Sequence, residues 1–232
     1  MKTLRQWLER GLRAGVEPLV AAFTRARIHP NVLSTLGFVI TCSSGFFFHQ
    51  HHVRTAGALI LLGGIFDLFD GSVARRTGLA SPFGAFYDST LDRLSEIVVY
   101  VGLLSLYNDY RLVLGDVGMI YAVLLAMAGS IMISYTRARA EGLGIECSVG
   151  LMQRAERVIL IGAASLLFGE QGRGVVLKGV IIGLAVLTNL TVIQRVWWVF
   201  KHTRPTGAPS PAEAHPGVGE PAEGRVQSFG SD

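Results

Sequence analysis

Long apolar segments dominate this 232-residue sequence and constrain its fold more than any other feature. Hydrophobic residues make up 50% of the chain and charged residues only 16%, which is too apolar for an ordinary soluble domain of this size. A backbone surrounded by lipid must satisfy its own hydrogen bonds, so we expect an all-α, polytopic membrane protein. Its six transmembrane helices are predicted at about 32–48, 56–69, 91–106, 117–135, 158–168 and 180–200.

The two ends of the chain differ from its apolar middle. Apolar residues recur at helical spacing from Leu4 to Phe23 with basic residues between them, which predicts a juxtamembrane amphipathic helix within 1–28. Asn31 is the expected N-cap of the first span, in a membrane domain that covers 29–202. The segment 203–232 is rich in Pro, Gly, Ala and Glu without apolar periodicity, which predicts a disordered cytoplasmic tail.

Basic residues are distributed unevenly over the connections between the predicted spans. On one side of a six-span arrangement there are only Arg54, Arg111, Arg173 and Lys178. The other Lys and Arg residues of the flanks and loops fall on the opposite side, so we expect both termini in the cytoplasm and the protein in the cell (inner) membrane. The net charge of +4 is not gathered in one block, which indicates contact with anionic membrane lipid and no nucleic-acid partner.

Four carboxylates stand at helical spacing in the segment 67–92, DLFDGSVARRTGLASPFGAFYDSTLD. Asp67 and Asp70 are three residues apart at the end of the second predicted span. Asp88 and Asp92 are four residues apart where the third span begins. Each pair lies on one face of its helix, and a short loop between antiparallel neighbours could bring the two pairs together.

Unpaired carboxylates at the edge of a bilayer repel one another, so positive charge must offset them. Arg75 and Arg93 are too few, whereas one or two Mg²⁺ or Mn²⁺ ions suit oxygen ligands and could neutralise a diphosphate during phosphoryl transfer. Glu96, one turn further on, is expected to pair with Arg93, to bind metal or to pack between two helices. Gly71 and Gly84 would let a nucleotide approach closely. Simple helix packing and capping could explain any one of these residues, but not the set.

The same segment resembles the signature of the CDP-alcohol phosphotransferase family. The match is Asp67-x-x-Asp70-Gly71-x-x-Ala74-Arg75, eight residues, then Gly84-x-x-x-Asp88-x-x-x-Asp92. No defined position departs from the signature. The resemblance extends over about 25–200 and implies an enzyme of phospholipid biosynthesis, a transferase that moves a phosphatidyl group from CDP-diacylglycerol to an alcohol and releases CMP.

The resemblance also implies roles for individual residues. The expected ligands of two Mg²⁺ or Mn²⁺ ions are Asp67, Asp70, Asp88 and Asp92. Asp92 would in addition be the catalytic base that accepts the proton of the attacking hydroxyl. The residues expected to bind the CDP part of the donor lipid are Asn31, Gly71, Arg75 and Ser81. Members of the family are commonly homodimers, and the same is expected here.

A second cluster of polar residues concerns the acceptor. The expected acceptor-binding residues are Ser134, Arg137, Arg154, Arg157 and Arg195. Four arginines can converge only if an anion offsets their repulsion, and a phosphomonoester suits the fork of the guanidinium group, so a phosphorylated alcohol is favoured. A positively charged cytoplasmic flank is the alternative explanation for the arginines from 137 to 157.

Within the family, the runs SYTRARAE and RAER resemble the bacterial phosphatidylinositol-phosphate synthases, with departures at Arg137 and Ala155. The expected acceptor is therefore inositol phosphate. Glycerol 3-phosphate, the acceptor of a phosphatidylglycerophosphate synthase, is the alternative, because charge alone does not distinguish the two. A membrane transporter is the alternative from another class. It would distribute polar residues over several spans at bilayer depth, whereas here they gather at one interface.

Overall fold

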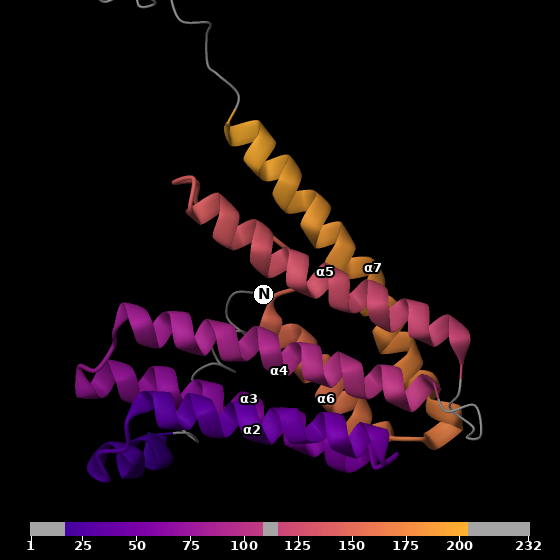
Figure 1. The fold of residues 1–232 in the computed structure, drawn as a ribbon, viewed down its shortest axis with the longest axis horizontal. Coiled ribbons are helices and arrows are strands. Elements are labelled where there is room, and N and C mark those ends of the chain that lie inside the picture. Colours follow the sequence, from indigo (N-terminus) through magenta and orange to yellow (C-terminus); the bar gives the residue numbers. More distant parts are fainter. Residues whose placement is uncertain (1–16, 109–115, 204–232) are drawn as a thin grey trace, which may run out of the picture.

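The computed structural model describes residues 17–108 and 116–203, and the regular elements in these ranges are all helices (Figure 1). Their bounds are α2 Pro30–His49, α3 Val53–Thr77, α4 Pro82–Asn108, α5 Val117–Glu141, α6 Arg154–Phe168 and α7 Gln171–His202. The predicted all-α fold is confirmed. Residues 1–16 of the expected amphipathic helix and 204–232 of the expected tail lie outside the described residues.

Four of these helices, α2, α3, α5 and α7, are long and apolar enough to cross a membrane. The other two predicted spans differ from them for separate reasons. α4 carries Asp88, Asp92, Arg93 and Glu96 between its start and its middle. α6 has 15 residues, and at 1.5 Å per residue its length of about 22 Å is less than the ~30 Å of a bilayer core.

The described part of the helix preceding α2 covers 17–25 and packs on the layer formed by α2 and α3. Val20 is buried in a small apolar cluster with Leu33, Phe69 and Val73. Glu17 forms an ion pair with Arg76 near the end of α3. These contacts attach the segment to the end of α3 that carries the aspartates.

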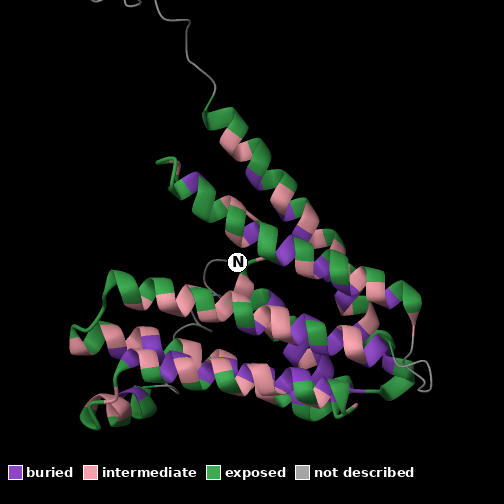
Figure 2. Ribbon diagram, viewed as in Figure 1, coloured by how far each residue is buried: buried purple, intermediate pink, exposed green. Residues whose placement is uncertain are grey.

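α2 packs against both α3 and α4, and α6 packs against α3 and α7 (Figure 1). α5 and α7 pack together as a pair that points away from the layer of α2, α3 and α4. Residues from all six helices meet in one apolar core, which includes Phe48, Ile60, Leu103, Val123, Ile161 and Ile181. The outward faces of the helices are largely exposed (Figure 2), and they carry large apolar side chains such as Phe46, Leu125 and Ile193. Such a surface suits lipid.

Two glycine positions bring α4 close to its neighbours α2 and α3. A Cβ atom on Gly102 would lie 2.6 Å from the Cα atom of Gly45, so α2 and α4 are in backbone contact there. Gly78 ends α3 in the left-handed conformation, with φ 69°, and a short loop then leads to Pro82 at the start of α4. The carboxyl end of α3 and the amino end of α4 are therefore neighbours.

Two helix starts differ from the sequence-based expectation. Asn31 was the predicted N-cap of the first span, and this was wrong. His29 is the N-cap and its ring accepts a hydrogen bond from the Asn31 backbone, with Pro30 in the first turn, where its missing N–H is not needed. α6 begins at Arg154, because Gln153 and Glu156 form a reciprocal capping box at its amino end.

Candidate active site

Three carboxylates come together where α3 ends and α4 begins. Asp67 and Asp70 belong to α3 and Asp88 to α4, and one oxygen of each lies within 4.8 Å of the others. Carboxylate oxygens at this separation are ligands that Mg²⁺ and Mn²⁺ prefer. The donor set therefore fits a divalent cation, which the clustered aspartates of the sequence predicted.

Asp70 is the most buried of these carboxylates, with 5% of its surface exposed. The hydroxyl of Ser34 on α2 donates a hydrogen bond to Asp70 Oδ2, with 2.6 Å between the oxygens. A hydrogen bond of this kind fixes the direction of a ligand carboxylate. Ser34 is not among the residues predicted from the sequence, although its spacing of one turn from Asn31 and Pro30 offered a signal.

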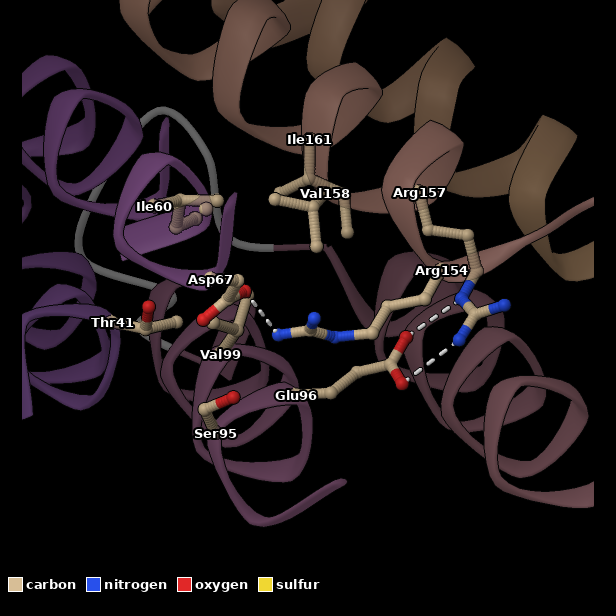
Figure 3. A pocket seen from close by; sticks show the side chains of 11 residues that line it. Thr41, Ile60, Asp67, Ser95, Glu96, Val99, Arg154, Arg157, Val158 and Ile161 are labelled. Atoms are coloured by element: carbon tan, nitrogen blue, oxygen red, sulfur yellow. Dashed lines mark hydrogen bonds and ion pairs between the residues drawn. The ribbon is translucent and has the colours of Figure 1, made fainter. Parts of the chain in front are cut away.

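Asp92 connects to the cluster through a cation from another helix. Nη2 of Arg154, at the start of α6, lies 2.8 Å from Asp67 Oδ2 and 2.7 Å from Asp92 Oδ1. Figure 3 shows the Arg154 side chain reaching from α6 toward Asp67. The sequence-based charge balance counted Arg75 and Arg93 only. Of these, Arg93 has its Nη1 atom 3.9 Å from Asp92, so Arg154 is the nearer partner.

A cavity of about 240 Å³ opens beside the carboxylates, between α2, α3 and α4. The four residues predicted to bind CDP all line it, next to two of the aspartates: Asn31, Gly71, Arg75, Ser81, Asp70 and Asp88. Gly84 also faces it, and its backbone N–H donates to Ser81 Oγ at 3.0 Å. A Cβ on Gly84 would lie 3.2 Å from Ser81 Oγ and 3.4 Å from Asn31 Oδ1, so a larger residue would crowd the cavity.

A second, much smaller cavity of about 20 Å³ lies deeper, between α3, α4 and α6 (Figure 3). At its side, Arg157 donates two hydrogen bonds to Glu96, from Nε to Oε1 at 2.7 Å and from Nη2 to Oε2 at 2.9 Å. Only 1% of Arg157 is exposed. Of the three expectations for Glu96, pairing with Arg93 is not observed, and its partner is Arg157 on the neighbouring helix α6, in agreement with a packed helix pair.

The remaining acceptor candidates lie elsewhere. Arg137 is exposed and pairs with Glu141 one turn on, with 2.8 Å between Nε and Oε1. Arg195 is buried and donates to two backbone carbonyls, from Nε to Val149 O at 2.8 Å and from Nη1 to Ile133 O. Ser134 is half-buried on α5. Of the five candidates, Arg154 is therefore the one that directly contacts the aspartates, and Arg157 lies one turn beyond it.

This arrangement of signature residues around one carboxylate cluster defines the class of protein. The sequence matches the family model for CDP-alcohol phosphatidyltransferases over residues 27–192, and the chain belongs to this family. It is an enzyme and a multi-pass membrane protein.

Known relatives agree with this assignment. An archaetidylinositol phosphate synthase from Methanothermobacter thermautotrophicus is 35% identical over 193 residues, which cover 83% of this chain and 92% of the relative. The fold is similar to that of a phosphatidylinositol phosphate synthase from Mycobacterium tuberculosis with CDP-DAG bound, at a TM-score of 0.72, 28% identity, and coverage of 82% and 94% of the two chains. The same synthase in complex with manganese and citrate matches at a TM-score of 0.72 and 28% identity, with coverage of 82% and 90%.

Proposed function

We propose that this enzyme transfers the phosphatidyl group of CDP-diacylglycerol to inositol phosphate and releases CMP. The observation that carries this proposal is the position of the three-aspartate cluster at the wall of a cavity lined by Asn31, Gly71, Arg75 and Ser81. A nucleotide diphosphate in that cavity would have its phosphates beside the carboxylates. The solved relative with CDP-DAG bound supports the identity of the donor.

The names of the relatives support inositol phosphate as the acceptor. One relative is an archaetidylinositol phosphate synthase and the other a phosphatidylinositol phosphate synthase, so their names differ in the lipid and share the inositol phosphate. The arginines support an anionic acceptor, because Arg154 reaches the aspartates and retains guanidinium N–H groups that a phosphate could accept from. We assign direct contact with the acceptor phosphate to Arg154, while acceptor binding by Ser134, Arg137, Arg157 and Arg195 stays a prediction.

We assign the catalytic base to Asp92 and the metal ligands to Asp67, Asp70, Asp88 and Asp92. Two Mg²⁺ or Mn²⁺ ions bound there would neutralise the diphosphate and the charge that develops on the leaving group. The Asp92 carboxylate accepts the proton of the acceptor hydroxyl, and that oxygen forms a bond with the lipid-linked phosphorus. The bond between this phosphorus and the bridging oxygen breaks, and CMP leaves with both electrons. Arg75, at the cavity wall, binds a phosphate oxygen of the donor.

The proposed enzyme has one membrane domain, 29–202, with six spans. We infer that α4 and α6 complete the bilayer crossing, with their charged groups facing the site between them. From the Lys and Arg asymmetry, both termini and the active site face the cytoplasm at the inner membrane. The homodimer implied by the family stays a prediction, which light scattering of the purified protein would test.

The proposed reaction is tested by CMP release from CDP-diacylglycerol by purified protein. Release should require both a divalent cation and inositol phosphate, and it should stop when a chelator removes the metal. Release of CMP without any added acceptor, at the same rate, would contradict a transferase and indicate hydrolysis of the donor.

A further inference from the structure

Two ion pairs, one helical turn apart, connect α4 and α6. Asp92 pairs with Arg154, and one turn further along both helices Glu96 pairs with Arg157. Each of these helices packs mainly on other elements, α4 on α2 and α6 on α3. The distance between α4 and α6 is therefore bridged by long charged side chains.

The two ion pairs differ in how many hydrogen bonds fix the arginine side chain. The Glu96 and Arg157 pair is bidentate, and Arg157 also donates to Met152 O at 3.3 Å. The Arg154 side chain is 29% exposed and contacts two carboxylates through Nη2 alone. Its Nε atom is buried without a hydrogen-bond partner in the described part of the chain. Arg154 thus has donors left over for an additional anion.

The oxygens that Arg154 contacts belong to groups that the proposed reaction needs. A divalent cation that binds Asp67 competes with the guanidinium for that carboxylate, and an acceptor hydroxyl competes with it for Asp92. We propose that Arg154 is a releasable latch: its guanidinium group holds the carboxylates of Asp67 and Asp92 until the phosphate of an anionic acceptor binds Arg154 and draws it away from them. This deepens the proposed function, on which it rests. Arg157, fixed by Glu96, keeps α6 in place while Arg154 moves.

The latch makes metal and acceptor binding cooperative. An anion that binds Arg154 frees Asp67 and Asp92, so it raises the affinity for the metal, and by linkage the metal raises the affinity for the anion by the same factor. The base also becomes available only when an acceptor is present, which restrains hydrolysis of the donor. Arg154 is therefore a positioning residue for the carboxylates as well as a contact for the acceptor.

The test is a Mn²⁺ titration of the purified full chain, with free Mn²⁺ followed by electron paramagnetic resonance, with and without inositol phosphate and without donor lipid. Inositol phosphate should tighten Mn²⁺ binding to the wild type by about tenfold, within the range typical of coupled sites. Arg154→Met should bind Mn²⁺ more tightly than wild type by a similar factor without the acceptor. It should gain nothing further when inositol phosphate is added.

Two variants control for charge. Arg93→Met removes a cation 3.9 Å from Asp92 that does not bridge to Asp67, and Arg139→Met removes an exposed one from the end of α5. Both should keep the response to inositol phosphate. The proposal is wrong if Arg154→Met binds Mn²⁺ no more tightly than the wild type, or if Arg93→Met binds Mn²⁺ as tightly as Arg154→Met. It is also wrong if inositol phosphate tightens Mn²⁺ binding equally in the wild type and in Arg154→Met. Failure of the proposed function would instead appear as no CMP release by the wild type.

Discussion

The hydroxyl of Ser34 lies 2.6 Å from Oδ2 of Asp70, and this hydrogen bond joins α2 to the carboxylate cluster. Asp70 is almost fully buried, so few other groups can fix the orientation of its carboxylate. Besides α3 and α4, helix α2 therefore contributes to the carboxylate cluster, through Ser34, a residue outside the aspartate signature.

Replacing Ser34 with Ala should weaken Mn²⁺ binding by roughly 10- to 100-fold, as is typical when a group that orients a metal ligand is lost. The matched control is Ser43→Ala on the same helix, whose hydroxyl donates to the backbone of Val39. Calorimetric titration with Mn²⁺ would measure both. Equal affinities in the two variants would show that Ser34 does not orient Asp70.

The buried pair of Glu96 and Arg157 should matter for stability. Glu96→Gln leaves a guanidinium that is 1% exposed without its counter-charge, which costs about 3–5 kcal/mol. Glu141→Gln breaks the exposed pair with Arg137, which is worth about 1 kcal/mol or less. Thermal unfolding in detergent should therefore show a much lower Tm for Glu96→Gln alone. Similar melting of the two variants would contradict a structural role for the buried pair.

Asp92→Asn should lower the rate of CMP release by at least about 100-fold, because an amide cannot accept the proton of the acceptor. Arg154 keeps its contact with Asp67 in this variant, so the protein should stay folded. Circular dichroism and the elution volume serve as the check on folding. Turnover near the wild-type rate in a folded Asp92→Asn protein would remove Asp92 from the role of base.

Much of the fold could be predicted from the sequence, because most of the apolar stretches are long. The starts of α4 and α6 could not be placed from hydropathy. Pro82 begins α4 nine residues before the apolar stretch at Leu91, and Arg154 begins α6 four residues before Val158. The first turn of α6 is charged, with Arg154, Glu156 and Arg157, and α4 carries Asp88 before its apolar stretch begins, so a search for apolar windows passes over both starts.

The candidate site was predicted where its residues are close in sequence and missed where they are distant. The spacing of the aspartates was enough to predict the cluster. The partnership of Arg154 with Asp92 joins residues 62 positions apart, and it depends on how α6 packs against α3. Four arginines were expected to converge on one acceptor, whereas the hydrogen bonds of Arg195 go to backbone carbonyls. Helical spacing carries no information on such contacts.

The six-span arrangement predicts that the loop before α3 and the C-terminal segment lie on opposite sides of the membrane. Single cysteines introduced next to His51 and next to Gly217, in a chain without Cys42 and Cys147, should be labelled by a membrane-impermeant maleimide from opposite sides. Labelling of intact cells should reach only the site near His51. Labelling of both sites from outside would contradict the topology.

The identity of the acceptor is tested most directly by competition. The purified enzyme would receive CDP-diacylglycerol, Mg²⁺ and equal amounts of inositol phosphate, glycerol 3-phosphate and free inositol. The lipid products would be identified and quantified by mass spectrometry. We predict that phosphatidylinositol phosphate dominates. The arginine beside the aspartates favours a phosphomonoester over free inositol, and the names of the relatives favour inositol phosphate over glycerol 3-phosphate. A dominant glycerophosphate lipid, or free inositol used as well as its phosphate, would contradict the assignment.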